Sequence, residues 1–189
     1  MNLKMPISTE DILKLKAGDE VKVTGTIFTA RDKAHMLFMQ EDFDRITDGV
    51  IYHCGPVVRK SAGGYEIVAA GPTTSARMSI YEPDVINKYG IKAIIGKGGM
   101  DEKTLEALRG RAVYLSAIGG AGLIYTSAIR RVVDVHHLDF GVPEAIWELE
   151  VADFPAIVTM DAHGNSLHEQ VRIDSERKLH KLIRLNPNH

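Results

Sequence analysis

The chain has 189 residues, of which 44% are hydrophobic and 25% charged, and its formal net charge is −2 at pH 7. This composition is typical of a globular protein with its own core, so we expect one domain over residues 1–189. The charge gives no reason to expect nucleic acid or an anionic membrane as partner, and no apolar run is long enough to span a membrane. The first residues lack the apolar segment of a signal peptide, so we expect a cytoplasmic protein.

The N-terminal part predicts a short helix, a strand and a second helix. Ser8-Thr-Glu-Asp11 has the pattern of a capping box, which indicates a helix within about the first 19 residues. Polar and apolar residues alternate over Glu20–Ile27, as in a half-buried strand. Met36, Phe38 and Met39 then suggest a helix packed on the core.

The middle of the chain alternates between strand-like and helix-like segments. After a polar linker, we expect a strand over Gly49–Cys54, an irregular segment or hairpin over Val57–Gly64, and a strand over Tyr65–Ala70. A helix follows from about Arg77 to Lys88. The next expected elements are strand Ile91–Ile95, helix Asp101–Arg109, strand Ala112–Ile118 and a helix from the turn at Gly119–Gly122 to about Val133.

The C-terminal part reads as two strands and a helical tail. Ala145–Val151 and Pro155–Met160 predict separate strands, and Asp161–Ser166 predicts a hairpin turn. The tail, residues 167–189, is basic and amphipathic, and we expect its helix to lie on the protein surface or on a partner. Together these elements predict the α/β class, as a mixed α+β fold with a mixed sheet.

Two turns rich in small residues carry the candidate chemistry. Gly71–Arg77 and Ile94–Met100 each follow an apolar, β-branched run and lead into a predicted helix. Unpaired backbone N–H groups and the helix dipole make such a helix start attractive to an anion. Thr73 and Thr74 add hydroxyl groups, and Arg77 and Lys97 add positive charge. The turns therefore indicate a site for a carboxylate or a phosphate.

Nucleotide and metal sites fit the sequence less well. Asp101 stands where the last glycine of a G-x-G-x-x-G pattern belongs, and the Walker pattern is absent. Asp134, His136, His137 and Asp139 match no recognised metal-site spacing, so we assign no metal to this chain. A competing interpretation of the cations is that each is only a solvated surface charge. Cys54, the only cysteine, is interpreted as a small residue within a strand.

Four motifs in this order resemble a known family. They are Ala30–His35, Gly71–Met78, Ile95–Met100 and Asp139–Trp147. The region from about Glu20 to Asn165 resembles the beta subunit, or C-terminal half, of iron–sulfur class I fumarate hydratases and of L-tartrate dehydratases. The resemblance implies a swivelling β/β/α domain, as in the aconitase family.

The resemblance also implies an activity, a cofactor and a partner. The activity would be the reversible hydration of fumarate to L-malate, with tartrate dehydration or non-catalytic dicarboxylate binding as alternatives. A [4Fe-4S] cluster would be held by an alpha subunit and not by this chain, since one thiolate cannot hold a cluster that usually needs three or four. We expect a heteromer, for which α2β2 is one fitting stoichiometry, and an isolated chain prone to self-association.

Site residues are carried over by motif. Arg31, Arg77 and Lys97 match the substrate-binding cations of the family, and Thr73 matches the proposed base that takes the C3 proton. Lys97 and Thr73 are thus the predicted catalytic residues, with Thr74 and Gly98 added as substrate-binding residues of the two turns. Relatives can carry glycine in place of Ala76, so the backbone shape there is a point of departure from the family.

Overall fold

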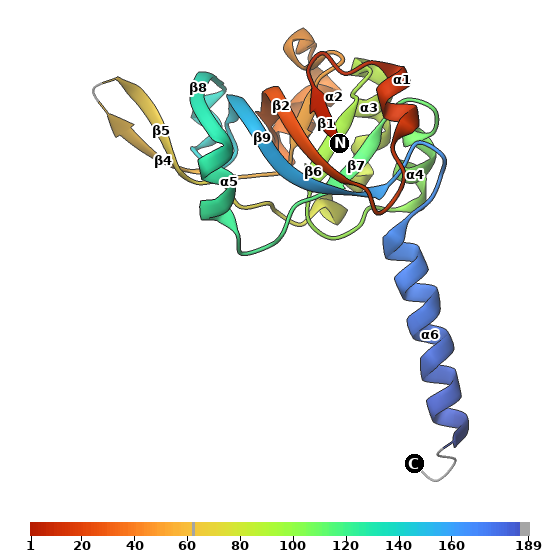
Figure 1. Cartoon of the computed structure of the whole chain (residues 1–189). Coiled ribbons are helices and arrows are strands. Elements are labelled where there is room, and N and C mark those ends of the chain that lie inside the picture. Colours follow the sequence, from red (N-terminus) through yellow and green to blue (C-terminus); the bar gives the residue numbers. More distant parts are fainter. Residues whose placement is uncertain (62, 186–189) are drawn as a thin grey trace.

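The computed structural model describes residues 1–61 and 63–185 and shows a mixed α+β fold (Figure 1). The strands are β1 (Asn2–Lys4), β2 (Glu20–Thr29), β3 (Val50–Tyr52), β4 (Val57–Ser61), β5 (Gly64–Ala69), β6 (Ala93–Gly96), β7 (Val113–Ser116), β8 (Ile129–His136) and β9 (Ile146–Met160). The α-helices are α1 (Thr9–Lys14), α2 (Asp32–Gln40), α3 (Glu82–Tyr89), α4 (Glu102–Leu108), α5 (Gly122–Ala128) and α6 (Leu167–Leu185). Short 3₁₀ helices are η1 (Asp44–Ile46), η2 (Ser75–Ile80) and η3 (Leu138–Phe140).

The main sheet is mixed and closes on itself. Its strand order is β1-β2-β3-β6-β7-β9-β8, and β2 also pairs with β9. The strands β2, β3, β6 and β7 are parallel to their neighbours in this row, whereas β9 runs antiparallel to β7, β2 and β8. Pairing between β2 and β9 joins five strands into a ring. The prediction of a mixed α+β fold with a mixed sheet is therefore confirmed.

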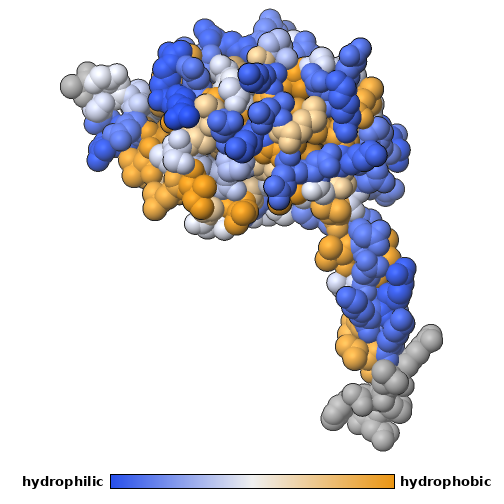
Figure 2. Space-filling model, viewed as in Figure 1, coloured by the Kyte–Doolittle hydropathy of each residue, from blue (hydrophilic) through white to orange (hydrophobic). Residues whose placement is uncertain are grey.

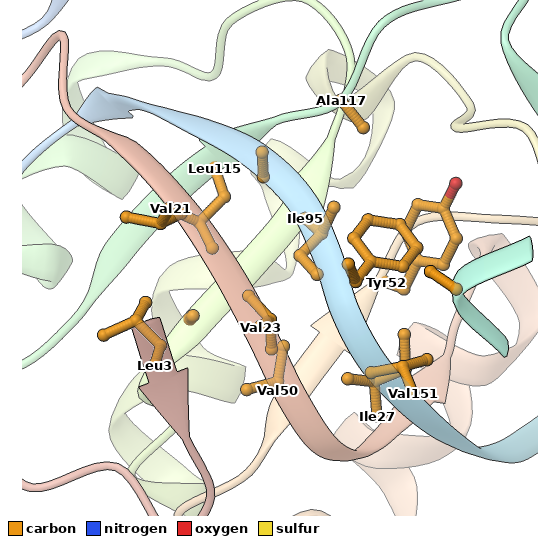
Figure 3. Close-up of a cluster of buried hydrophobic side chains, with 14 of the residues drawn as sticks. Leu3, Val21, Val23, Ile27, Val50, Tyr52, Ile95, Leu115, Ala117 and Val151 are labelled. Carbon is orange, nitrogen blue, oxygen red and sulfur yellow. The ribbon is translucent and has the colours of Figure 1, made fainter. Parts of the chain in front are cut away.

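Alternate residues of the ring strands belong to two hydrophobic cores, one inside the ring and one outside it. Inward-facing side chains such as Val23, Tyr52, Ile95 and Leu115 meet inside the ring (Figure 3). Their sequence neighbours point outward and pack against α2, α3 and α4. The outer core includes Phe28, Ile51, Ile94, Tyr114, Phe38, Val85, Ile86 and Leu108. Because side chains alternate along a strand, β3 and β6 are buried on both faces, whereas parts of β2 and β9 have one exposed face.

Several local signals in the sequence are confirmed. Ser8 caps α1 by accepting a hydrogen bond from the Asp11 N–H, and Asp101 caps α4 in the same way from Thr104. Gly90 ends α3 in a left-handed conformation with φ 65°. The hairpin interpretation of Val57–Gly64 is also confirmed, since β4 and β5 pair antiparallel. The hairpin forms a sheet of its own and extends from the body (Figure 1).

Other boundaries were predicted wrongly. The helix expected to reach Val133 ends at Ala128, and β8 follows at once along β9. The two strands expected within 145–160 are one strand, β9. Asp153 takes a positive φ of 54°, and the register on β2 shifts between Val23 and Gly25, so one bulge absorbs the interruption.

Three further expectations need correction. The expected N-terminal helix region also contains β1, which lies parallel to β2. Met36 and Met39 are exposed by 46% and 42%, so only Phe38 of the three packs into the core. The turn at Asp161–Ser166 is closed by a single antiparallel bridge between Met160 and Ser166 and then leads into α6. This helix projects away from the body and does not lie on it, so a contact with a partner stays a prediction (Figure 1). The tail residues 186–189 are outside the described residues.

Candidate functional site at the ends of the parallel strands

The predicted site residues gather where parallel strands end. Arg31 follows β2 and stands at the N-cap of α2, while Lys97 follows β6 directly. Parallel strands end at the same edge of a sheet, so both positions share that edge. Thr73 and Thr74 come from the segment after β5, which returns to this edge through a bridge between Pro72 and Cys54. This is the edge at which open parallel sheets usually bind ligands.

Backbone hydrogen bonds hold the two predicted turns side by side. The Thr73 N–H donates to the His53 carbonyl at 2.7 Å, and the Lys97 N–H donates to the Thr73 carbonyl at 3.3 Å. The Ser75 N–H donates in turn to the Lys97 carbonyl at 3.1 Å. The structure therefore brings Thr73, Thr74 and Lys97 together, as two extended segments and not as two loose loops. Gly98, exposed with φ 74°, continues directly from Lys97.

Three backbone N–H groups that we expected to be free for an anion at the two helix starts are not free. The N–H groups of Thr73, Ser75 and Lys97 are already used in the bonds between the turns. The first turn enters the 3₁₀ helix η2, and α3 begins only at Glu82. In the second turn, four residues separate Lys97 from α4, and the Asp101 side chain caps that helix. Positive charge at this edge therefore comes from side chains more than from helix dipoles.

Two of the predicted cations form ion pairs within the chain. Arg31 lies 3.2 Å from Glu144, and both side chains are mostly buried. Arg77 donates to Asp32, the residue after Arg31, at 3.1 Å, and this pair is about half exposed. The interpretation of every cation as a solvated charge is therefore wrong for Arg31. The Arg77–Asp32 pair also brings Arg77 next to the Arg31 turn.

Unpartnered buried atoms mark this edge. Among the described residues, buried side-chain atoms without a hydrogen-bond partner are Arg31 Nε, Thr73 Oγ1, Glu82 Oε1 and His168 Nε2. Buried polar atoms are normally paired, so each unpaired one needs a reason. Arg31 Nε is a donor and Thr73 Oγ1 can donate or accept, and both belong to the predicted site. Together they offer hydrogen bonds to an anionic ligand.

A buried polar cluster beneath the two turns was missed. It consists of His35, His53, Ser75, Glu82 and Tyr114, and His35, His53, Ser75 and Glu82 are each 0% exposed. Glu82 Oε2 lies 2.9 Å from His35 Nε2 and 3.0 Å from His53 Nε2. The available signal was a histidine within an apolar strand-like run at His53, which the sequence interpretation passed over. Gly96 permits the cluster, because a Cβ there would overlap the Ser75 hydroxyl.

Cys54 does not fit a cluster ligand. It is fully buried, and burial raises the pKa of its thiol to about 12. A metal-bound cysteine must be a thiolate, and an iron–sulfur cluster usually needs several of them. The interpretation of Cys54 as a small buried residue agrees with this environment.

Of the histidines set aside in the sequence, His136 is the last residue of β8, and His137 follows it at the start of η3. His136 Nε2 approaches Glu148 at 3.4 Å and Asp134 at 3.8 Å, while His137 stacks on the Phe140 ring. Arg45 also binds Glu148, at 3.0 Å. With a guanidinium already on its carboxylate, we interpret this group as an ion-pair cluster.

Exposed apolar side chains flank the site. Ile118, Leu123 and Ile124, here called the α5 patch, are 66%, 75% and 60% exposed. Gly119, next to Ile118, approaches the Lys97 side chain. The space-filling view shows apolar surface on this part of the body and along α6 (Figure 2). Within the described residues, no helix has both the length and the apolar content that crossing a membrane requires.

The fold is an α+β domain with cationic side chains at one edge of its sheet. Residues 1–171 match the family model described as Fumarase C-terminus, and the chain belongs to that family.

Similar proteins carry two kinds of name. The chain is 50% identical over 182 residues to "Putative fumarate hydratase class I" of Geobacillus stearothermophilus, a match that covers 95% of this chain and 35% of that protein. It is 42% identical over 189 residues to "Putative L(+)-tartrate dehydratase subunit beta" of Methanocaldococcus jannaschii, covering 95% and 96%. It is 35% identical over 182 residues to "L(+)-tartrate dehydratase subunit beta" of Escherichia coli K12, covering 93% and 90%. The chain thus spans about a third of the first relative and nearly all of the others.

Proposed function

We propose that this chain is the beta subunit of a two-subunit hydro-lyase that reversibly hydrates fumarate to L-malate. The family match and the names of the relatives support a subunit of a hydratase or dehydratase. The observation that carries the proposal is the pair of unpartnered buried atoms, Arg31 Nε and Thr73 Oγ1. Arg77 lies on the same turn as Thr73, and Lys97 lies on the turn that pairs with it.

The cations suit a dicarboxylate. A guanidinium holds a carboxylate through two parallel hydrogen bonds, and a lysine adds a compact charge. Glu144 and Asp32 hold Arg31 and Arg77 in place before a ligand arrives. Such preorganised charge stabilises the negative charge that develops when a proton leaves the carbon next to a carboxylate. The roles we assign are substrate binding for Arg31, Arg77, Thr74 and Gly98, and binding and catalysis for Lys97.

Thr73 is the proposed proton acceptor. Dehydration of malate breaks a C–H bond at C3 and a C–O bond at C2, and the C3 proton would pass to Thr73 Oγ1. An alcohol is a poor base near neutral pH. Thr73 Oγ1 is buried, and the backbones of Thr73 and Lys97 are hydrogen-bonded. The proposal requires the Lys97 ammonium to approach Thr73 Oγ1 when substrate is bound and so favour the ionised oxygen.

The cofactor and the partner belong to the same proposal. The buried Cys54 does not fit a cluster ligand, so we propose that a [4Fe-4S] cluster is held by an alpha subunit. The α5 patch supports an alpha-subunit contact beside the site, since clustered exposed apolar side chains often mark an interface. A neighbouring hollow lined by Ile118, Ile124, Tyr125 and Ile157 extends this apolar surface.

Anaerobic co-expression with a candidate alpha subunit tests the proposal. The complex should form fumarate from L-malate, and Thr73→Ala and Lys97→Ala should each lower kcat/KM by about 10²–10³-fold without loss of the complex. Lys103→Ala, at an exposed position of α4, serves as the control and should keep full activity. A cluster-loaded wild-type complex without activity on either malate or tartrate would contradict the hydro-lyase. Full activity in both site variants would discard the site.

The second candidate is the beta subunit of an L-tartrate dehydratase, which the names of two relatives favour. Malate and tartrate share both carboxylates and differ in a hydroxyl group, so the same cations serve either substrate. The ratio of kcat/KM for the two substrates decides between them. A non-catalytic dicarboxylate-binding module would instead bind dicarboxylates as an isolated chain, with an affinity that the alpha subunit does not change.

A further inference from the structure

The buried cluster beneath the site forms a continuous chain of hydrogen bonds. It runs from the Tyr114 hydroxyl to Ser75 Oγ at 2.8 Å, on to His53 Nδ1 at 2.8 Å, and from His53 Nε2 to Glu82 Oε2 at 3.0 Å. His35 approaches the same carboxylate oxygen from the other side at 2.9 Å. Water does not reach these groups, so they depend on one another for hydrogen bonds, and Glu82 Oε1 is the cluster atom without a partner among the described residues.

Donor and acceptor accounting fixes the protonation of the two histidines. His35 faces the Arg31 carbonyl at Nδ1, 2.8 Å away, and a carboxylate oxygen at Nε2. Both partners only accept, so both ring nitrogens must carry a proton and His35 is an imidazolium. His53 donates to Glu82 from Nε2, which leaves Nδ1 to accept from Ser75. The Tyr114 hydroxyl donates to Ser75 Oγ, and His53 Nδ1, 2.8 Å away, can accept the proton of Ser75, so we assign His53 as neutral.

The electrostatics agree with this assignment. Burial alone would lower the pKa of His35, but the charge of Glu82 and its hydrogen bond raise the pKa above its ordinary value. For His53, burial outweighs Glu82 and lowers the pKa. Burial would raise the pKa of Glu82, but His35 and His53 together bring it down to about 2. The cluster thus holds one positive and one negative charge.

Three parts of the candidate site are attached to this cluster. His35 binds the carbonyl of Arg31. The His53 carbonyl accepts from the Thr73 N–H, and the Ser75 N–H donates to the Lys97 carbonyl. The His35 side chain thus contacts the Arg31 turn, and the backbones of His53 and Ser75 contact the other two turns. None of these contacts involves a proposed reacting atom.

We propose that His35, Glu82 and His53 are positioning residues that fix the Arg31, Thr73 and Lys97 turns relative to one another. The buried charge pair makes the arrangement specific, because any displacement of a turn leaves a buried charge or polar atom without its partner. The kinetic part of this inference rests on the proposed function, whereas its structural part does not.

Histidine ¹⁵N NMR and amide hydrogen exchange on the full chain test the structural part. His35 should show two protonated ring nitrogens at neutral pH, and His53 a single proton on Nε2. In Glu82→Gln the imidazolium signature of His35 should be lost, and exchange at the Thr73 and Ser75 amides should accelerate by at least about tenfold. A neutral His35 in the wild type, or unchanged exchange at these amides, would overturn the inference.

Tyr89→Phe is the matched control. Tyr89 is a buried tyrosine of α3 whose hydroxyl bonds the carbonyls of Phe38 and Glu41, away from the three turns. It should leave exchange at Thr73 and Ser75 at the wild-type rate. Equal acceleration in both variants would show a general loss of stability and contradict a positioning role.

Kinetics of the complex with the alpha subunit test the consequence for catalysis. Glu82→Gln should lower kcat/KM by roughly tenfold to a hundredfold, since small misplacements of reacting groups cost that much, and Tyr89→Phe should not. The NMR arm gives its answer without any activity, so an inactive wild-type complex would count against the proposed function alone. A metal analysis of the isolated chain is a further test. If it found one zinc ion per chain, and none in His53→Gln, the cluster would be a metal site and the inference would be overturned.

Discussion

Burial decides which charges of this chain affect its stability. Exposed pairs such as Arg59–Glu66 are screened by water and salt. The His35–Glu82 pair is fully buried, so removal of one partner leaves a charge without compensation. Breaking such a pair typically costs about 3–5 kcal/mol.

The dependence of stability on pH should reveal this pair. The pKa of Glu82 falls from 4.5 to about 2 on folding, so its contribution is present above about pH 4.5 and is lost as the pH falls towards 2. The pKa of His35 is raised from 6.5, so its contribution is full below pH 6.5 and is lost as the pH rises through the folded value. The facing groups that shift these pKa values are His53 and, at longer range, Asp32.

Wild type and Glu82→Gln should therefore differ most in free energy of unfolding between about pH 4.5 and pH 6.5. Urea unfolding across the pH range measures this difference. Lys14→Met, which removes an exposed ion pair with Asp11, is the control and should show no such maximum. A difference that stays constant from pH 3 to pH 8 would contradict the buried ion pair.

At the scale of elements, α6 contributes little to the fold. Residues 175–183 are exposed, and the helix contacts the body near its start, where His168 packs against Gly99 and the Tyr114 ring. A chain that ends at Asp174 should change the free energy of unfolding by less than about 0.5 kcal/mol. Thermal unfolding checks this, with a chain that ends at Ser166 as the control. The shorter chain loses His168 and should be clearly less stable; equal behaviour of the two would contradict the anchoring of α6 at its start.

Local sequence signals predicted elements well where caps and alternation are strong. The capping box at Ser8 predicted the start of α1 correctly, because its interactions lie within a few residues. The β8 segment was mistaken for helix because Ile129, Val132 and Val133 do not alternate strictly, and its pairing with β9 decides the structure. The long-range pairing of β2 with β9 likewise turned two expected strands into one.

The candidate site could be predicted only in part. Thr73, Lys97, Arg31 and Arg77 stand in recognisable motifs, and parallel strands bring their turns to one edge. The cluster beneath them joins His35, His53 and Glu82 from three separate segments of the chain. No local sequence pattern predicts a hydrogen bond between residues so far apart in sequence. The ion pairs with Asp32 and Glu144 were missed for the same reason.

At the scale of the whole molecule, the α5 patch beside Lys97 predicts where the alpha subunit docks. Ile124→Glu should weaken the complex by at least about tenfold, because a charge would be buried among apolar groups, and should leave the thermal midpoint unchanged. Val57→Glu, equally exposed but on the β4–β5 hairpin, should bind normally. Titration of labelled alpha subunit measures both affinities. If Ile124→Glu bound the alpha subunit normally, the interface would not include the α5 patch.

The buried pair of charges also constrains how this sequence can evolve. A change at Glu82 alone leaves the His35 imidazolium without its ion-pair partner, and a change at His35 alone does the same to the Glu82 carboxylate. Either single substitution therefore lowers the stability of the fold. A joint replacement of His53 and Glu82 by apolar residues, with His35 then neutral, avoids that cost. Relatives should therefore separate into those that keep both His53 and Glu82 and those that keep neither. Ancestors with only one of the two should be rare and less stable.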